Sequence, residues 1–199
     1  DGTVPFSAPT TMSDGKLYGS TYYGGTSGRG TLYRVNLDGT QYQVLHAFTG
    51  NTDDGANPGA PLIQATDGKL YGTSYQGGAA NFGTVFRLDP DTLAFEVIHS
   101  FAGAATDAGY TYAGLVQGPD GSLYGNTPAI AGNSGTVFRL NPDGTSFAVL
   151  RQFLSSSGEA YSPQGALVVG SDGLLYGSLA YGGASGAGAI FRMGLAGAD

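Results

Sequence analysis

Few residues in this chain could perform acid–base or metal chemistry. There are two histidines, His46 and His99, two glutamates, Glu96 and Glu159, and no cysteine. The histidines occupy equivalent places in a repeated pattern, where Arg151 takes the third such place. A repeat spaces equivalent residues apart instead of gathering them around one substrate or ion. We therefore predict structural or surface positions for both histidines, and no histidine metal site.

Most other carboxylates are aspartates of Asp-Gly and Asp-Pro turns, where such side chains bond the nearby main chain. No opposed pair suited to glycoside hydrolysis stands out from these turns. Asp53, Asp54, Asp89 and Asp91 could offer oxygen ligands to calcium, yet no calcium-loop sequence surrounds them. Turn roles are favoured, and we predict no catalytic residue, no metal and no cofactor.

Three motifs recur in fixed order along the chain. Asp-Gly-x-Leu-Tyr-Gly begins at Asp14, Asp67, Asp120 and Asp172, at spacings of 53, 53 and 52 residues. A short apolar segment follows each and ends at Arg34, Arg87, Arg139 and Arg192. A third motif occurs three times and ends at Phe48, Phe101 and Phe153. The order indicates tandem repeats, with units at about 1–53, 54–106, 107–158 and 159–199.

Composition narrows the class of protein. With 36 glycines in 199 residues, a long-helix protein is excluded, because interior glycine destabilises helices. The 13 tyrosines and 10 phenylalanines argue against disorder. A net charge of −7 argues against a nucleic-acid partner, which needs clustered Lys and Arg. No apolar run is long enough to predict a membrane span.

Each unit has the pattern of four short strands. In the second unit we expect strands at 60–65, 70–75, 84–88 and 95–101, with a tight turn at Asp67-Gly68. Segments such as Thr-Val-Phe-Arg-Leu carry apolar side chains on both faces, so both faces should be covered. A four-stranded unit of about 50 residues, covered on both sides, is typical of a propeller blade. We predict an all-β, four-bladed β-propeller, with residues 1–199 forming one domain.

The pattern contains no fourth strand for the last unit. The segment from Gly194 to Gly197 aligns with the turn from Asn141 to Gly144, which precedes a fourth strand. We therefore expect the last blade to lack its outer strand. Three explanations remain open: a three-stranded blade, a piece of a longer array, or a strand supplied by another subunit through β-augmentation. The first strand, at Ser7–Met12, is also atypical, as terminal repeats often are.

Two further sets of residues are candidates for binding. The repeated arginines could form a ring facing an anionic sugar, but we favour pairing of each with a turn aspartate or loop carbonyl of its own blade. Tyrosines beside the Gly-Gly pairs could stack on sugar rings at one rim, or could simply pack. These glycan candidates are Tyr22, Tyr23, Tyr75 and Tyr181.

The linked motifs closely resemble the bacterial GloVer tandem repeat over nearly the whole chain. That resemblance implies an exported, surface-associated, propeller-like repeat protein, and it brings no established activity or catalytic residue. The third unit departs from the pattern at 127–132, which replaces the Gly-Gly stretch, and at Arg151, which replaces histidine.

We expect a non-enzymatic extracellular structural protein, a building block of a cell-surface array or fibre. Its partners would be other copies of itself or adjacent repeats of a longer array. The alternative is a glycan-binding module that takes surface polysaccharide. A third hypothesis is a polysaccharide-degrading enzyme, such as a lyase that uses Tyr, His and Arg.

Overall fold

The computed structural model describes residues 1–103, 107, 109–128 and 134–197. Residues 129–132, in the segment where the third repeat departs from the Gly-Gly pattern, lie outside this part of the chain. The chain divides into two compact units, Asp1–Phe101 and Ala102–Asp199, each with two repeats. The division falls near the predicted boundary between the second and third repeats.

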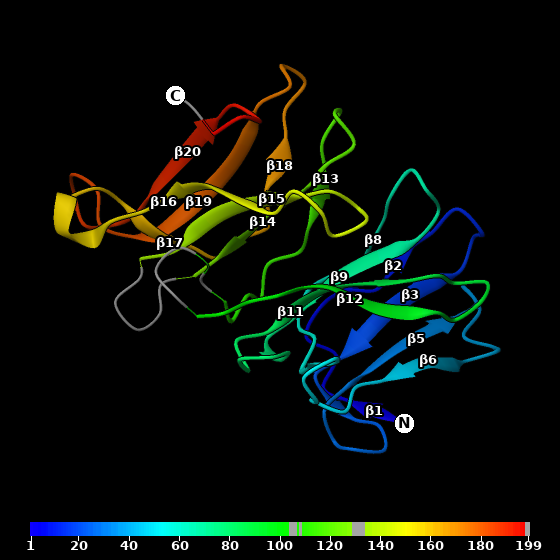
Figure 1. Ribbon diagram of the computed structural model, residues 1–199. Coiled ribbons are helices and arrows are strands. Elements are labelled where there is room, and N and C mark those ends of the chain that lie inside the picture. The colour runs from blue at the N-terminus through cyan, green and yellow to red at the C-terminus, as the bar shows by residue number, and fades with distance from the viewer. Residues whose placement is uncertain (104–106, 108, 129–133, 198–199) are drawn as a thin grey trace. The chain divides into compact units, whose positions relative to one another are not determined.

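The first unit contains two four-stranded antiparallel sheets, shown from blue to green in Figure 1. The first sheet has the order β2 (Thr10–Thr11), β3 (Leu17–Thr21), β5 (Thr31–Val35) and β6 (Gln43–Ala47). The second sheet has the order β8 (Ile63–Gln64), β9 (Leu70–Ser74), β11 (Thr84–Leu88) and β12 (Phe95–Ser100). Two short pairs accompany them: β1 (Gly2–Thr3) with β4 (Tyr23–Gly24), and β7 (Gly55–Ala56) with β10 (Gln76–Gly77).

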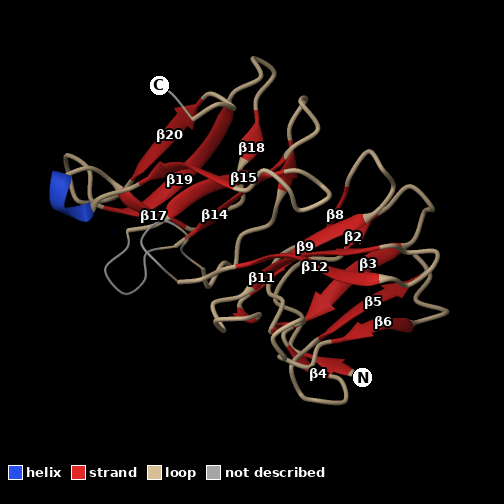
Figure 2. Cartoon of the chain, in the orientation of Figure 1, coloured by secondary structure: helices blue, strands red, loops and turns tan. Residues whose placement is uncertain are grey.

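The second unit repeats this plan once in full and once in part. Its complete sheet has the order β13 (Val116–Gln117), β14 (Leu123–Thr127), β15 (Thr136–Leu140) and β16 (Ala148–Gln152). In the last sheet, β19 (Leu175–Tyr181) pairs with β17 (Tyr161–Pro163), β18 (Val168–Val169) and β20 (Ala189–Met193). The 3-10 helix η1 (Ser155–Ser157) is the blue element of Figure 2, and the residues described contain no α-helix.

The Asp-Gly turns join the first and second strands of each sheet. In the second repeat, Gly68 has a φ of +82° and donates its N–H to the Ala65 carbonyl at 2.9 Å. Lys69 donates its N–H to Asp67 Oδ1 at 3.1 Å. The aspartate therefore closes the turn from within, and glycine supplies the left-handed conformation that it requires.

The strand bounds differ from expectation in two respects. The first strands have two residues each, shorter than the predicted Ala60–Ala65, and Pro9 and Pro61 precede two of them without an N–H to donate. The Gly-Gly connections also form their own short pairings with the start of a repeat, as in β10 with β7. The sequence pattern gave no sign of this second pairing.

A hydrophobic core lies between the two repeats of each unit. In the first unit it includes Tyr18, Leu32 and Phe48 from repeat one, with Leu62 and Phe86 from repeat two. In the second unit the same kinds of position pack together, drawn from repeats three and four: Tyr124, Val137, Phe153, Leu167 and Leu175. Stacked small sheets with a core between them confirm the all-β prediction.

Candidate functional site

Each repeat links its turn aspartate to the tyrosine of the next strand. The tyrosine hydroxyl donates to Asp Oδ2 at 2.7–2.9 Å in all four repeats, while Oδ1 accepts a main-chain N–H two residues further on. Burial, with the hydrogen bond to Asp120, raises the pKa of Tyr124 to about 12. Both oxygens of each aspartate are thus engaged in holding a turn. The aspartates are Asp14, Asp67, Asp120 and Asp172.

The repeated arginines lie directly opposite these tyrosines in the strand register. The pairs are Arg34 with Tyr18, Arg87 with Tyr71, Arg139 with Tyr124 and Arg192 with Tyr176. Arg87 forms an ion pair with Glu96 on β12, at 2.6 Å between Nη2 and Oε2.

Arg34 makes the corresponding contact in the first repeat. It donates from Nε to Gln43 Oε1 on β6 at 3.0 Å, and from Nη1 to the Pro90 carbonyl at 3.3 Å. In these two repeats the third-strand arginine therefore bonds the side chain of the residue facing it on the fourth strand. Residues opposite one another on adjacent strands are in closest reach, which explains the choice.

Three of the four glycan candidates gather in the first unit. Tyr22 is buried and lies between Phe6, at 4.9 Å between ring centroids, and Tyr23, at 4.8 Å. Tyr75 follows at 6.5 Å from Tyr22. Tyr181 lies in the second unit, beside Tyr161 at 5.7 Å. Tyr23 and Tyr181 expose about half of their surface, so these two offer open ring faces.

A histidine–aspartate pair that was not predicted from the sequence lies between the first two repeats. His46 Nε2 lies 3.0 Å from Asp54 Oδ1, and the imidazole stacks on Phe95 at 3.7 Å with an interplanar angle of 2°. Asp54 also accepts hydrogen bonds from Thr49 N and Oγ1 and from Gly55 N. Burial alone would raise the pKa of Asp54, but the hydrogen bonds from His46 and Thr49 together lower it. With so many local partners, the carboxylate holds the end of the first repeat and the start of the second together. We call the His46–Asp54 pair the clamp.

The same clamp recurs in the second unit with different residues. Arg151 takes the place of His46, and its Nη2 lies 3.2 Å from Oε2 of Glu159, which takes the place of Asp54. Both acids follow their basic partners by eight residues (54 − 46 = 159 − 151). This shared spacing of eight residues was the sequence signal from which the two pairs could have been predicted. His99, the remaining histidine, lies on β12 opposite Val85 and contacts Phe101 edge-on at 5.0 Å.

The fourth repeat differs from the others at its last strand. In the residues that the structure describes, β20 pairs with β19 and has no neighbour on its other side, whereas β5, β11 and β15 each lie between two strands. Ile190 of β20 is 83% exposed, while its counterparts in the other repeats are fully buried at 0%: Leu32, Val85 and Val137. The fourth repeat therefore presents both an open strand edge and an uncovered apolar face.

The direction of the main-chain N–H and C=O groups on β20 can be inferred from the equivalent strand β11. Thr84 N–H is bonded to Ser74 Oγ on the β9 side. Because main-chain groups alternate in direction along a strand, those of Val85 and Arg87 point toward β12. Their counterparts, Ile190 and Arg192, direct main-chain groups to the open edge of β20. An unpaired row of this kind is a template for another strand.

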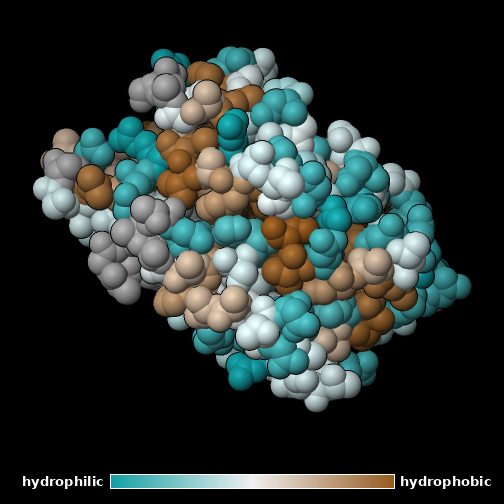
Figure 3. All heavy atoms as spheres, viewed as in Figure 1, coloured by the Kyte–Doolittle hydropathy of each residue, from teal (hydrophilic) through white to brown (hydrophobic). Residues whose placement is uncertain are grey.

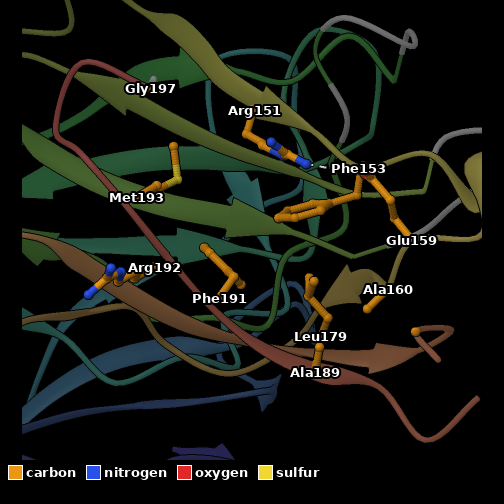
Figure 4. A pocket seen from close by; sticks show the side chains of 11 residues that line it. Arg151, Phe153, Glu159, Ala160, Leu179, Ala189, Phe191, Arg192, Met193 and Gly197 are labelled. Atoms are coloured by element: carbon orange, nitrogen blue, oxygen red, sulfur yellow. Dashed lines mark hydrogen bonds and ion pairs between the residues drawn. The ribbon is translucent and has the colours of Figure 1, made fainter. Parts of the chain in front are cut away.

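A cavity of about 350 Å³ lies beside this edge within the second unit. Figure 4 shows Phe153 and Phe191 pointing into it, with Arg151 and Leu179 at its border. In Figure 3, brown apolar atoms gather where Figure 1 draws β16 and β20. An apolar hollow next to unpaired main chain can bind an extended segment through both hydrogen bonds and side chains.

Among residues 1–103, 107, 109–128 and 134–197, no group of three or more His, Cys, Asp or Glu side chains is placed to hold a metal ion. No helix in that part of the chain has the length and apolar character to cross a membrane.

The fold and its repeated sheets define an all-β repeat protein. The Gloeobacter/Verrucomicrobia repeat matches residues 1–191, so the chain belongs to this family. The predicted membership of the GloVer-type family is thereby confirmed. No curated protein matches the chain.

Several solved structures are similar in fold. A structure of the nidogen/laminin complex has a TM-score of 0.59 and 15% identity, covering 88% of this chain and 57% of that one. A gluconolactonase from Xanthomonas campestris has a TM-score of 0.57 and 21% identity, covering 96% and 59%. TolB from Acinetobacter baumannii has a TM-score of 0.56 and 17% identity, covering 94% and 41%. The chain thus spans about half the length of these structures, and the likeness shows a propeller-like all-β fold.

Proposed function

We propose that this chain is a non-enzymatic structural repeat protein, a building block of an extracellular array or fibre. The observation that supports this most is the open edge of β20, which has the direction and apolar surroundings to accept an antiparallel strand. The strand would come from another copy of the chain or from an adjacent repeat of a longer array. A head-to-tail contact of this kind that does not close on itself produces a filament.

The engagement of the polar residues supports a structural role. The four turn aspartates and Asp54 use their oxygens to hold local main chain. The arginines of the first two repeats hold neighbouring strands. Charged residues make up only 12% of the sequence, which favours close packing between copies. We propose an extracellular, cell-surface location because the linked motifs resemble those of exported repeat proteins.

The proposal includes a four-bladed ring in which residues 1–199 form one domain. Two counterparts of Ile190, Leu32 and Val137, are each packed in a core with residues of the following repeat of the same unit. A covering repeat would bury Ile190 in the same way. Ile190→Lys should then destabilise the protein by about 2–3 kcal/mol, as expected for a charge placed in an apolar contact. Urea unfolding within 0.5 kcal/mol of the parent chain would contradict ring closure.

The strand-accepting role is tested by removing one outward N–H. Ile190→Pro keeps an apolar side chain but removes the donor that faces the edge, and proline is tolerated on edge strands. Ile190→Val is the matched control, since it keeps the donor. We expect light scattering to show assemblies for the parent and the Val variant, and loss of assembly for the Pro variant. Assembly that is equal in all three chains would contradict the proposal.

A second function is favoured by the aromatic cluster around Tyr22. Tyr23 and Phe6 expose about half of their surface or more beside this buried ring, and exposed aromatic faces suit stacking on sugar rings. In this reading the cluster is a glycan-binding platform. Titration with oligosaccharides should show saturable binding that Tyr23→Ala abolishes and Tyr42→Ala leaves intact. Equal binding by both variants would exclude this platform.

A further inference from the structure

The second unit holds two tyrosines directly opposite one another on paired strands. Tyr161 of β17 and Tyr181 of β19 are partners in the antiparallel register, beside the pair of Pro163 with Leu179. The two tyrosine ring centroids lie 5.7 Å apart, with an interplanar angle of 37°. Residues opposite one another on adjacent strands project from the same face, so the strand pairing itself keeps the two phenol rings in contact.

The fold does not require tyrosine at either of these positions. The corresponding pairs are Ala56 with Gln76 in the second repeat and Thr3 with Tyr23 in the first. In both repeats the same two short strands pair without two facing aromatic rings. Among the described register pairs, only that of the fourth repeat sets two tyrosines opposite one another.

The surroundings leave both phenols available to react. Gly182 follows Tyr181, and a Cβ there would lie 3.1 Å from Tyr161 Cδ1, so glycine leaves room for the Tyr161 ring. Tyr161 is half-buried, and Tyr181 is 52% exposed. Within the described part of the chain, neither hydroxyl donates a hydrogen bond to the protein, whereas the Tyr176 hydroxyl is held by Asp172.

The composition directs one-electron oxidation of this chain to tyrosine. The sequence contains 13 tyrosines and two methionines, with neither cysteine nor tryptophan. Sulfur side chains are common targets of oxidants when they are accessible. Both methionines, Met12 and Met193, are buried. A half-exposed phenol that touches a second phenol is therefore a favourable site for oxidative coupling.

We propose that Tyr161 and Tyr181 form a cross-linking site, at which hydrogen peroxide and a haem peroxidase join the two rings into a dityrosine. Each phenol gives up one electron and its hydroxyl proton, and the two tyrosyl radicals couple through a new bond between ring carbons ortho to the hydroxyls. The hydrogen on each of these carbons then moves to the neighbouring oxygen, which restores both phenols. The two electrons and two protons reduce one hydrogen peroxide to two waters.

The new bond ties the start of the fourth repeat to the Gly-Gly connection of the same repeat. It closes a loop of main chain from residue 161 to residue 181. Such a closure stabilises the folded state by restricting the unfolded chain, as a disulfide does. Both tyrosines belong to one chain, so the cross-link forms whether or not copies of the chain assemble.

The test oxidises the dilute, folded full chain with hydrogen peroxide and a haem peroxidase, and recovers the band of single-chain mass from a denaturing gel. Cleavage by trypsin and before aspartate gives peptides 152–171 and 172–192, and Tyr161 is the only tyrosine of the first. Mass spectrometry should find the two peptides joined, with two hydrogens fewer than their sum. Fragmentation should place the bond at Tyr181 and not at Tyr176.

Two matched variants and one matched condition identify the pair. Tyr181→Phe should abolish the joined peptide, because phenylalanine keeps the ring and lacks the hydroxyl that is oxidised. Tyr176→Phe, which changes the other tyrosine of the same peptide, should leave the joined peptide intact. Oxidation of the chain unfolded in urea should yield less of this peptide and more of other dityrosines, since only the fold holds these two rings together.

Three results would overturn the proposal. One is dityrosine at other positions of the folded or unfolded chain with none between residues 161 and 181 of the folded chain. Another is the joined peptide in species of double mass alone, which would assign the bond to a contact between copies. The third is an equal yield from folded and unfolded chains, which would show that the strand register does not position the pair.

Discussion

The same kinds of side chain form two junctions, one between repeats one and two and one between repeats three and four. The first junction includes a fourth strand from the later repeat, and the described part of the second does not. In the first, His46, Asp54 and Phe48 meet a sheet of four strands, and Phe95 fills the space between them. In the second, Arg151, Glu159 and Phe153 meet a sheet that ends at β20. The comparison teaches that equivalent positions of the preceding repeat supply the basic, acidic and aromatic side chains of both junctions.

The comparison also separates a buried clamp from an exposed one. Asp54 is 7% exposed and accepts several hydrogen bonds, whereas the side chains of Arg151 and Glu159 are 39% and 52% exposed. A buried carboxylate with many donors is costly to remove, and an exposed ion pair is worth little. The two clamps should therefore contribute unequally to stability.

The two junctions should differ most in the stability that is lost when the third-strand aromatic residue of each is replaced by alanine. Phe86→Ala should lower the free energy of unfolding by about 3–5 kcal/mol, because the ring is fully buried. Phe191→Ala, at a cavity, should lower it by roughly half as much. Urea denaturation followed by tyrosine fluorescence measures both. Equal losses would show that Phe191 is already covered in solution.

A smaller difference in stability should appear when the acidic residue of each clamp is replaced by its neutral amide. Asp54→Asn should destabilise the protein by about 1–3 kcal/mol, because buried donors lose their charged acceptor. Glu159→Gln, the matched change in the second unit, should cost less than about 1 kcal/mol. Thermal and urea unfolding of the two variants check this order, and a larger loss for Glu159→Gln would contradict it.

The smallest expected effect is the change with pH in the stability that Asp54 contributes. Hydrogen bonds in the folded state outweigh burial and lower the pKa of Asp54 below its unfolded value. A depressed carboxyl pKa stabilises the fold above the unfolded value of about 3.9, and that contribution is lost as pH falls through the folded pKa. The stability gap between the parent chain and Asp54→Asn should therefore shrink below about pH 4. Urea unfolding from pH 6 to 3 tests this, and a constant gap would contradict it.

Much of the fold was predictable because short local motifs specify the structure of each repeat. Asp67-Gly68 specifies its turn chemically, and the apolar segment at 84–88 is β11 with the bounds that were predicted. The pairing of β7 with β10 was not predictable in this way, because two residues of glycine-rich connection carry no pattern. The sequence also could not show that the arginines choose Gln43 and Glu96, since that choice depends on the strand register.

The candidate site was predictable in outline and not in detail. The repeated motif ending at Arg192 indicated a third strand in the last repeat, and β20 pairs with β19 as β15 pairs with β14. The clamp was missed because His46 and Arg151 were compared with each other and not with the acids eight residues later. The cavity required coordinates, since it depends on the orientation of Phe153 and Phe191.

The most direct test of the central claim is electron cryomicroscopy of assembled full-length chain. The strand-accepting role predicts filaments in which an additional antiparallel strand lies along β20. A monodisperse particle of 20.1 kDa, the mass of a single chain, would contradict it. Filaments whose density leaves the β20 edge unpaired would contradict it equally.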